Sequence, residues 1–136
     1  MAKVMTRIVL IVLACCMLTA CAPKTLESIF NQSDNKKMLD EQIEQIKESP
    51  SNKSTYSDVK WSAKGNDLSF EYYYAKDLTD DQIATLKSSI DAQHDGLKSV
   101  VDNLKDSIEK ELKIRPESIN YIYFTKDGKE ITRLTY

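Results

Sequence analysis

The strongest constraint on the fold is a change in hydrophobic period along the chain. Apolar residues alternate with polar ones at period two in residues 59–74, and two further runs rich in apolar residues, 119–124 and 131–136, flank a Lys-Asp-Gly-Lys turn. Between these regions, apolar residues recur at helical spacing from Ile83 to Ile108. Period two indicates a strand with one buried face, whereas steps of three and four residues indicate an amphipathic helix. The pattern therefore predicts strands, then a helix, then strands.

Each of the two strand regions is predicted to be a β-hairpin. Gly65-Asn66 is the turn signal within residues 59–74. In the second region, Asp127-Gly128 supplies the positive φ angles that a tight hairpin turn needs. It separates the expected strands Ile119–Phe124 and Ile131–Tyr136.

The region between the hairpins is predicted to be one long helix. Thr79 and Gln82 have the spacing of a capping box, which begins helices. Asp95-Gly96 lies inside the apolar stripe, where it would favour a break. The stripe keeps its phase across that pair, so we expect a single helix, kinked at most, that ends near Lys113.

Two shorter helices are expected before the first hairpin, one from about Thr25 and one over residues 34–48. Their apolar stripes are about half a turn out of phase, which indicates a break at residues 31–35. As one continuous rod they would form a stalk about 36 Å long. We expect instead that the second helix folds back onto the domain and covers a sheet face. The residues that would make this contact are Leu39, Ile43 and Ile46.

These elements predict an α+β domain: an antiparallel sheet of two hairpins, with one long helix between them and short N-terminal helices. The strand aromatics lie on both faces, because Tyr73 points opposite to Tyr72, and Phe124 opposite to Tyr123. One face must pack on the long helix. The second face is either covered by the N-terminal helices or left as an apolar surface for a partner, with Tyr73 and Phe124 as its exposed members.

Residues 1–20 have the three parts of a secretory signal peptide. Lys3 and Arg7 form the basic start, and residues 8–20 are an uncharged, mostly apolar run of 13 residues. That run is shorter than the roughly 20 residues that span a bilayer. The segment is therefore predicted to be removed and not to serve as a membrane span.

The sequence Leu18-Thr19-Ala20-Cys21 resembles the bacterial lipobox in all four positions. It predicts cleavage between Ala20 and Cys21 and a lipid on the Cys21 thiol. The chain then divides into a signal peptide (1–20), a lipidated tether (21–24) and a single domain (25–136). The expected location is the outer face of the bacterial cytoplasmic membrane, or the outer membrane if the source is Gram-negative.

Cleavage changes what chemistry the chain can perform. It leaves 116 of the 136 residues and lowers the net charge from −2 to −4, because Lys3 and Arg7 are lost. A weakly acidic chain without a basic block is a poor nucleic-acid binder. Cys15 and Cys16 leave with the signal and Cys21 is acylated, so no thiol remains for a disulfide, a zinc site or a nucleophile. We expect no cofactor.

No catalytic residue is expected. His94 is the only histidine and falls near the apolar stripe of the long helix, as a surface or core-edge residue does. The nearest approach to a metal motif places Asp91, Asp95 and Asp102 at positions one, five and twelve of a calcium-binding loop. Gln93 at position three and the unbroken helical phase argue against such a loop. Calcium binding is therefore kept only as an alternative.

The whole arrangement resembles a family of small lipoproteins of Gram-positive anaerobes that carry one domain of unknown function. The resemblance implies this fold and location and implies no activity. It rests on the lipobox and on five further patterns: Leu26-Glu27-Ser28-Ile29, the Lys36-to-Ile46 helix, the Val59-to-Tyr74 hairpin, Leu78-Thr79-Asp80-Asp81-Gln82 and Tyr123-Phe124-Thr125-Lys126-Asp127-Gly128.

The sequence thus favours an extracytoplasmic binding or interaction module, anchored in the membrane through Cys21. Its expected partner is a protein or a glycan, bound by the strand aromatics. A different class of function, an envelope structural protein that oligomerises through the second sheet face, remains open.

Overall fold

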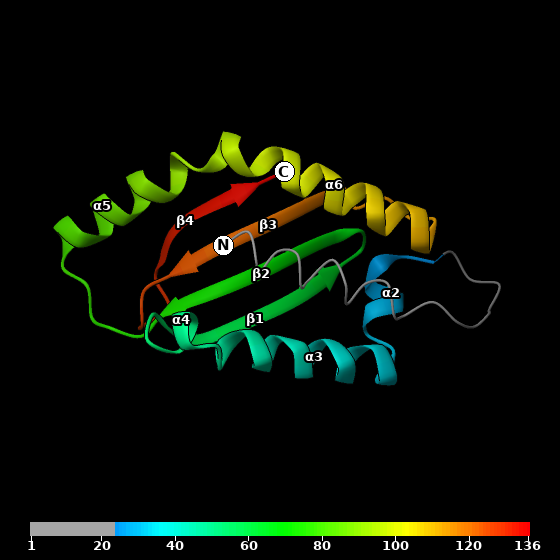
Figure 1. Ribbon diagram of the computed structural model, residues 1–136, viewed down its shortest axis with the longest axis horizontal. Helices are drawn as coiled ribbons and strands as arrows, with labels where there is room; N and C mark the ends of the chain where they lie inside the picture. The colour runs from blue at the N-terminus through cyan, green and yellow to red at the C-terminus, as the bar shows by residue number, and fades with distance from the viewer. Residues whose placement is uncertain (1–23) are drawn as a thin grey trace.

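The computed structural model describes residues 24–136, so the predicted signal peptide, the predicted cleavage site and Cys21 lie outside the described part (Figure 1). The predicted α+β class, the two hairpins and the N-terminal helices are confirmed. The elements, in chain order, are α2 (Leu26–Phe30), α3 (Ser33–Lys47), α4 (Pro50–Lys53), β1 (Tyr56–Lys64), β2 (Asp67–Tyr74), α5 (Asp80–Asp91), α6 (His94–Leu112), β3 (Ser118–Phe124) and β4 (Glu130–Thr135).

The four strands form one sheet in the order β1-β2-β3-β4. Both hairpin pairs are antiparallel, as predicted. The central pair is parallel, with Asp67 opposite Ser118 and Tyr73 opposite Phe124, so the sheet is mixed and not antiparallel throughout. The reason is the connection, because α5 and α6 carry the chain back to the end of the sheet where β2 began.

The connection between the hairpins is two helices, and the prediction of one long helix was wrong. Ala92 and Gln93 separate α5 from α6, three residues before the Asp95-Gly96 pair. Figure 1 shows the two helices as an arch along the β4 edge. A straight helix of this length would extend about 50 Å, whereas the nine residues of β1 span only about 30 Å. The bend keeps the apolar stripe on the sheet, where Ile90, Val101, Leu104 and Ile108 are buried.

The N-terminal helices belong to the core and do not form a stalk. As predicted, α3 buries Leu39, Ile43 and Ile46, and it packs against β1. In α2, Phe30 is buried and meets Trp61 edge to face, with ring centroids 6.2 Å apart. No helix in residues 24–136 has both the length and the apolar character needed to cross a membrane.

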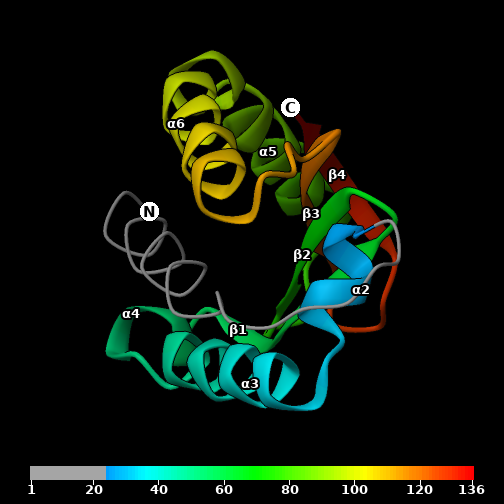
Figure 2. The same cartoon turned by 90° about the vertical axis from the view of Figure 1, so that its right-hand side faces the viewer.

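Helices α3, α4, α5 and α6 lie on the same face of the sheet, and α2 lies at the β1–β2 turn (Figure 2). On that face α3 packs beside β1, and α5 packs against β4 at the other edge. The expectation that α3 would cover the second face was therefore wrong. The cause lies in β1, whose second-face side chains Asp58, Lys60 and Ser62 are polar and give α3 no apolar surface to bury.

Candidate functional site

The structure brings Tyr73 and Phe124 together on the second face. Their rings stack with centroids 4.8 Å apart and an interplanar angle of 11°. The Tyr73 hydroxyl donates a 2.8 Å hydrogen bond to Glu71, and burial together with this bond raises the pKa of Tyr73 to about 12. The Lys60 ammonium lies 4.6 Å from the Tyr73 ring centroid. The two predicted residues are thus each half-buried, because their rings cover each other and charged side chains lie beside them.

The three aspartates of the calcium alternative lie on helices and do not converge. Asp91 accepts a 2.6 Å hydrogen bond from Thr132, and Asp102 pairs with Lys98 at 2.9 Å. Asp95 is fully exposed in the first turn of α6. Within residues 24–136, no group of three His, Cys, Asp or Glu side chains is placed to hold a metal ion.

His94 fastens the end of the chain to the start of α6. Its ring stacks on Tyr136 with centroids 4.7 Å apart, and the Tyr136 hydroxyl donates a 3.0 Å hydrogen bond to the His94 carbonyl oxygen. The ring nitrogen Nε2 lies 3.3 Å from the Thr135 carbonyl oxygen. These contacts give His94 a structural role at the edge of the core.

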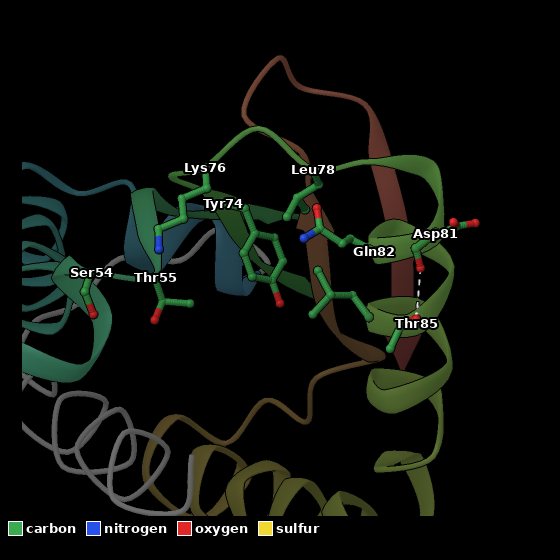
Figure 3. Close-up of a pocket in the computed structure, with 9 residues that line it drawn as sticks. Ser54, Thr55, Tyr74, Lys76, Leu78, Asp81, Gln82 and Thr85 are labelled. Carbon is green, nitrogen blue, oxygen red and sulfur yellow. Dashed lines mark hydrogen bonds between the residues drawn. The ribbon is translucent and has the colours of Figure 1, made fainter.

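The candidate site is a pocket of about 510 Å³ at the end of the sheet where β2 stops (Figure 3). This volume is typical of small-ligand sites, which measure about 300–1,000 Å³. The lining comes from the segment before β1, from the end of β2 with the loop that follows it, and from one side of α5. The lining residues are Ser54, Thr55, Tyr74, Lys76, Leu78, Asp81, Gln82, Thr85 and Leu86.

Tyr74 joins the pocket to a cluster of tyrosines on the helix-covered face. Its ring lies 5.2 Å from that of Tyr56, which lies 5.2 Å from that of Tyr72. Burial raises the pKa of both Tyr56 and Tyr74 above the ordinary value. The Tyr74 hydroxyl can donate a hydrogen bond or accept one.

Gln82 presents an amide N–H₂ group to the pocket because the capping box holds its oxygen. The predicted box forms: the Thr79 hydroxyl accepts from the Gln82 backbone N–H, and Gln82 Oε1 accepts from the Thr79 backbone N–H at 2.9 Å. The amide nitrogen lies on the side of the pocket in Figure 3. It has no hydrogen-bond partner within the described part of the chain.

Lys76 gives the pocket an unpaired positive charge. It is exposed in the loop after β2, and its side chain in Figure 3 extends toward Thr55. No carboxylate of residues 24–136 lies within ion-pair distance of its ammonium group. The other charged lining residue is Asp81, whose carboxylate points away from the pocket in Figure 3. Leu78 and Leu86 add apolar surface.

A second hollow of about 360 Å³ lies between the start of α5 and the β3–β4 turn. It contrasts with the first because acidic residues predominate in its lining. Lys126 lies 3.7 Å from Asp77, and the remaining lining carries Asp80, Asp127 and Lys129. Three carboxylates against two lysines make this hollow less favourable for an anion than the pocket beside Lys76.

One protein family matches residues 26–136, and its description is a domain of unknown function, DUF4854. The chain belongs to the DUF4854 family. No curated protein and no solved structure matches it. The DUF4854 match begins at Leu26, the first residue of α2, and so contains the whole described core and every lining residue of the pocket.

The pocket of this DUF4854 domain was not predicted from the sequence. Gln82 was expected as a capping residue and Tyr74 as a strand aromatic, and no role was expected for Lys76. One sequence feature could have indicated the site: Lys76 lies in the short loop between the end of a strand and a capping box. Only the path of α5 back across the sheet places these three side chains around one cavity.

Proposed function

We propose that the protein is a lipid-anchored binding module on the outer face of a bacterial membrane, with the pocket at Tyr74 as its ligand site. The observation that carries the ligand site is the placement of two unpartnered donors, the Lys76 ammonium and the Gln82 amide nitrogen, around one cavity that the Tyr74 ring also lines. The role is non-catalytic, since the lining hydroxyls have no histidine beside them and the one lining carboxylate points away.

The proposed anchor is a lipid on Cys21, supported by the lipobox. The folded domain begins only a few residues later, because Thr25 caps α2. Residues 22–24 extend at most about 10 Å. In turn, α2 is fastened to the β1–β2 turn: the Glu27 backbone N–H donates to the Gly65 carbonyl at 2.9 Å, and the Gly65 N–H donates to the Glu27 carboxylate at 2.7 Å. The turn end of the sheet would thus face the membrane.

In this arrangement the pocket faces away from the lipid. Strand β2 starts beside the turn at Asp67 and ends seven residues later at Tyr74, a distance of about 23 Å. Figure 1 places α2 at one end of the sheet, and α4 and the start of α5 at the other. A ligand that belongs to another envelope component, a protein or a glycan, would meet the pocket there. The resemblance to lipoproteins of Gram-positive anaerobes fits this location.

Replacing Cys21 tests the anchor. We expect Cys21→Ser to abolish metabolic labelling with a palmitate analogue and to release the protein from the membrane fraction. Cys15→Ser and Cys16→Ser are the matched controls, because both residues lie in the predicted signal peptide, and they should label normally. A Cys21→Ser protein that still labels and sediments with membranes would contradict the anchor.

Site-specific photo-crosslinking in intact cells tests the pocket. A benzophenone side chain in place of Thr85, which lines the pocket, should form adducts that the same probe in place of Asn103, exposed on α6, does not form. Equal adduct formation at both positions would argue against a ligand site in the pocket. This result does not depend on knowing the ligand.

The second face supports a second candidate function, assembly of the envelope through self-association. It carries no described helix, and it holds the Tyr73–Phe124 pair. Sedimentation of the mature lipoprotein over a range of concentrations tests this candidate. A concentration-dependent oligomer that Phe124→Glu dissociates would support assembly, and a monomer at all concentrations would exclude it.

A further inference from the structure

We propose that the pocket binds a carboxylate carried by an apolar body. The inference rests on the proposed ligand site and names the chemistry that this site recognises. It follows from the hydrogen-bonding character of the lining, from its charge, and from its apolar residues.

The groups that face the pocket without a partner are donors. The Lys76 ammonium and the Gln82 amide nitrogen can only donate. The Tyr74 hydroxyl, which also lines the pocket, can donate as well as accept. The strongest acceptors of the lining are committed or turned away, since Gln82 Oε1 accepts from Thr79 and the Asp81 carboxylate points outward. The complementary ligand group is therefore an acceptor.

Of the remaining lining hydroxyls, that of Ser54 can both donate and accept, and the protons of the other two are committed. The Thr85 hydroxyl donates to the Asp81 carbonyl at 2.9 Å, and the Thr55 hydroxyl donates to the Ser51 carbonyl at 3.0 Å. Each proton is thus used within the protein. These two hydroxyl oxygens can still accept a hydrogen bond from a neutral part of a ligand.

The charge of the pocket selects a monoanion. Lys76 is its single unpaired cation, which one carboxylate neutralises. A phosphate monoester carries between one and a half and two negative charges at neutral pH, so part of its charge would remain unmatched. Leu78 and Leu86 face the same cavity and favour an apolar group next to the anion.

Two sources supply such a group, the C-terminus of a polypeptide and a free organic acid. Fluorescence anisotropy on the mature lipoprotein in phosphatidylcholine nanodiscs measures the chemistry. The probes are two fluorescein-labelled peptides of sequence Gly-Ser-Gly-Ser-Ala-Phe, one with a free C-terminal carboxylate and one with a C-terminal amide. We expect the amide to bind at least about tenfold more weakly, since it lacks the charge that Lys76 would meet.

Variants assign the effect to the pocket. Lys76→Gln should lower the affinity for the carboxylate peptide to that for the amide peptide. It should leave the affinity for the amide peptide unchanged. Lys64→Gln is the matched control, because Lys64 is also exposed but lies at the opposite end of the sheet, and it should change nothing. Both substitutions are on the surface, and unchanged melting temperatures would verify the fold.

Competition separates the two sources. Displacement of the labelled peptide by N-acetylphenylalanine would point to free acids, and displacement by the unlabelled peptide alone would point to a polypeptide C-terminus. Equal affinity for the carboxylate and amide peptides, or no binding of either, would overturn the carboxylate proposal. The crosslinking result at Thr85 would remain separate, so the pocket can stand as a ligand site when this ligand chemistry fails.

Discussion

Thr132 Oγ1 lies 2.6 Å from Asp91 Oδ1 and donates a hydrogen bond to it. This bond joins the last residue of α5 to the buried side of β4. Lys87 strengthens the junction, with its ammonium 2.8 Å from Asp91 Oδ2 and 3.3 Å from the Thr132 hydroxyl. These contacts lie just before the bend between α5 and α6. They therefore fix the position of the end of α5 on β4.

Thr132→Val should lower the free energy of unfolding by about 1 kcal/mol, because it keeps the buried shape and removes one hydrogen bond. Urea denaturation followed by circular dichroism measures the change. Thr85→Val provides the control, since Thr85 is exposed and bonds only within its own helix. Comparable losses of unfolding free energy in both variants would show that the hydrogen bond to Asp91 does not stabilise the protein.

The same variant should show a defined pH dependence. The hydrogen bond from Lys87 is the largest cause that lowers the pKa of Asp91 below its ordinary value of 3.8, and the hydrogen bond from Thr132 lowers this pKa further. A lowered pKa in the folded state stabilises the protein above pH 3.8, and this stabilisation is lost as the pH falls through the folded-state pKa. The stability difference between wild type and Thr132→Val should therefore persist at pH 7 and narrow below pH 3.8. A difference that widens in acid would refute this assignment.

The packing of α3 on β1 predicts a large effect of truncating its buried stripe. Ile43 is 7 % exposed, so Ile43→Ala should cost about 2–4 kcal/mol of unfolding free energy. Gln45→Ala, two residues further along the same helix on the exposed side, should change stability little. Equal melting temperatures for the two variants would mean that α3 is detached from the domain in solution.

Lys113 ends α6 in the left-handed region, with φ at 58°. A side chain is unfavourable there and glycine is not, so Lys113→Gly should stabilise the protein by about 1 kcal/mol. Lys110→Gly, inside the helix, should instead destabilise it by about 1 kcal/mol. Thermal melts of the two variants should move in opposite directions, and a lower melting temperature for both would contradict the cap.

The buried tyrosines predict unfolding in alkali. Burial raises the pKa values of Tyr56, Tyr72, Tyr121 and Tyr123 above the ordinary value of 10.0. A raised pKa in the folded state gives stability that is complete below pH 10 and is lost as the pH rises through the folded-state value. Phenolate absorbance at 295 nm and loss of the circular dichroism signal should therefore rise together above pH 10. Full ionisation of the tyrosines with an intact spectrum would show that the cluster is open to solvent.

Much of this fold could be predicted because its elements are local patterns. The alternation around Gly65, the Asp127-Gly128 turn, the capping box at Thr79, and the stripe of Leu39, Ile43 and Ile46 each lie within one short stretch of chain. Each pattern was sufficient to predict its hairpin or helix, because backbone geometry converts a local period into a buried face. The fold-back of α3 was predictable for the same reason.

Some features depend on contacts between distant segments, and the tertiary structure alone decided them. The parallel pairing of β2 with β3 depends on how far α5 and α6 return along the sheet, and the bend at Ala92-Gln93 depends on the length of the strands beneath them. The pocket is of the same kind, since Thr55, Lys76 and Gln82 meet only when three segments reach one end of the sheet. By itself, the sequence determined the elements and the faces they bury, because those follow from neighbours along the chain. The arrangement of the elements, and with it the candidate site, was set by which buried faces fit together in space.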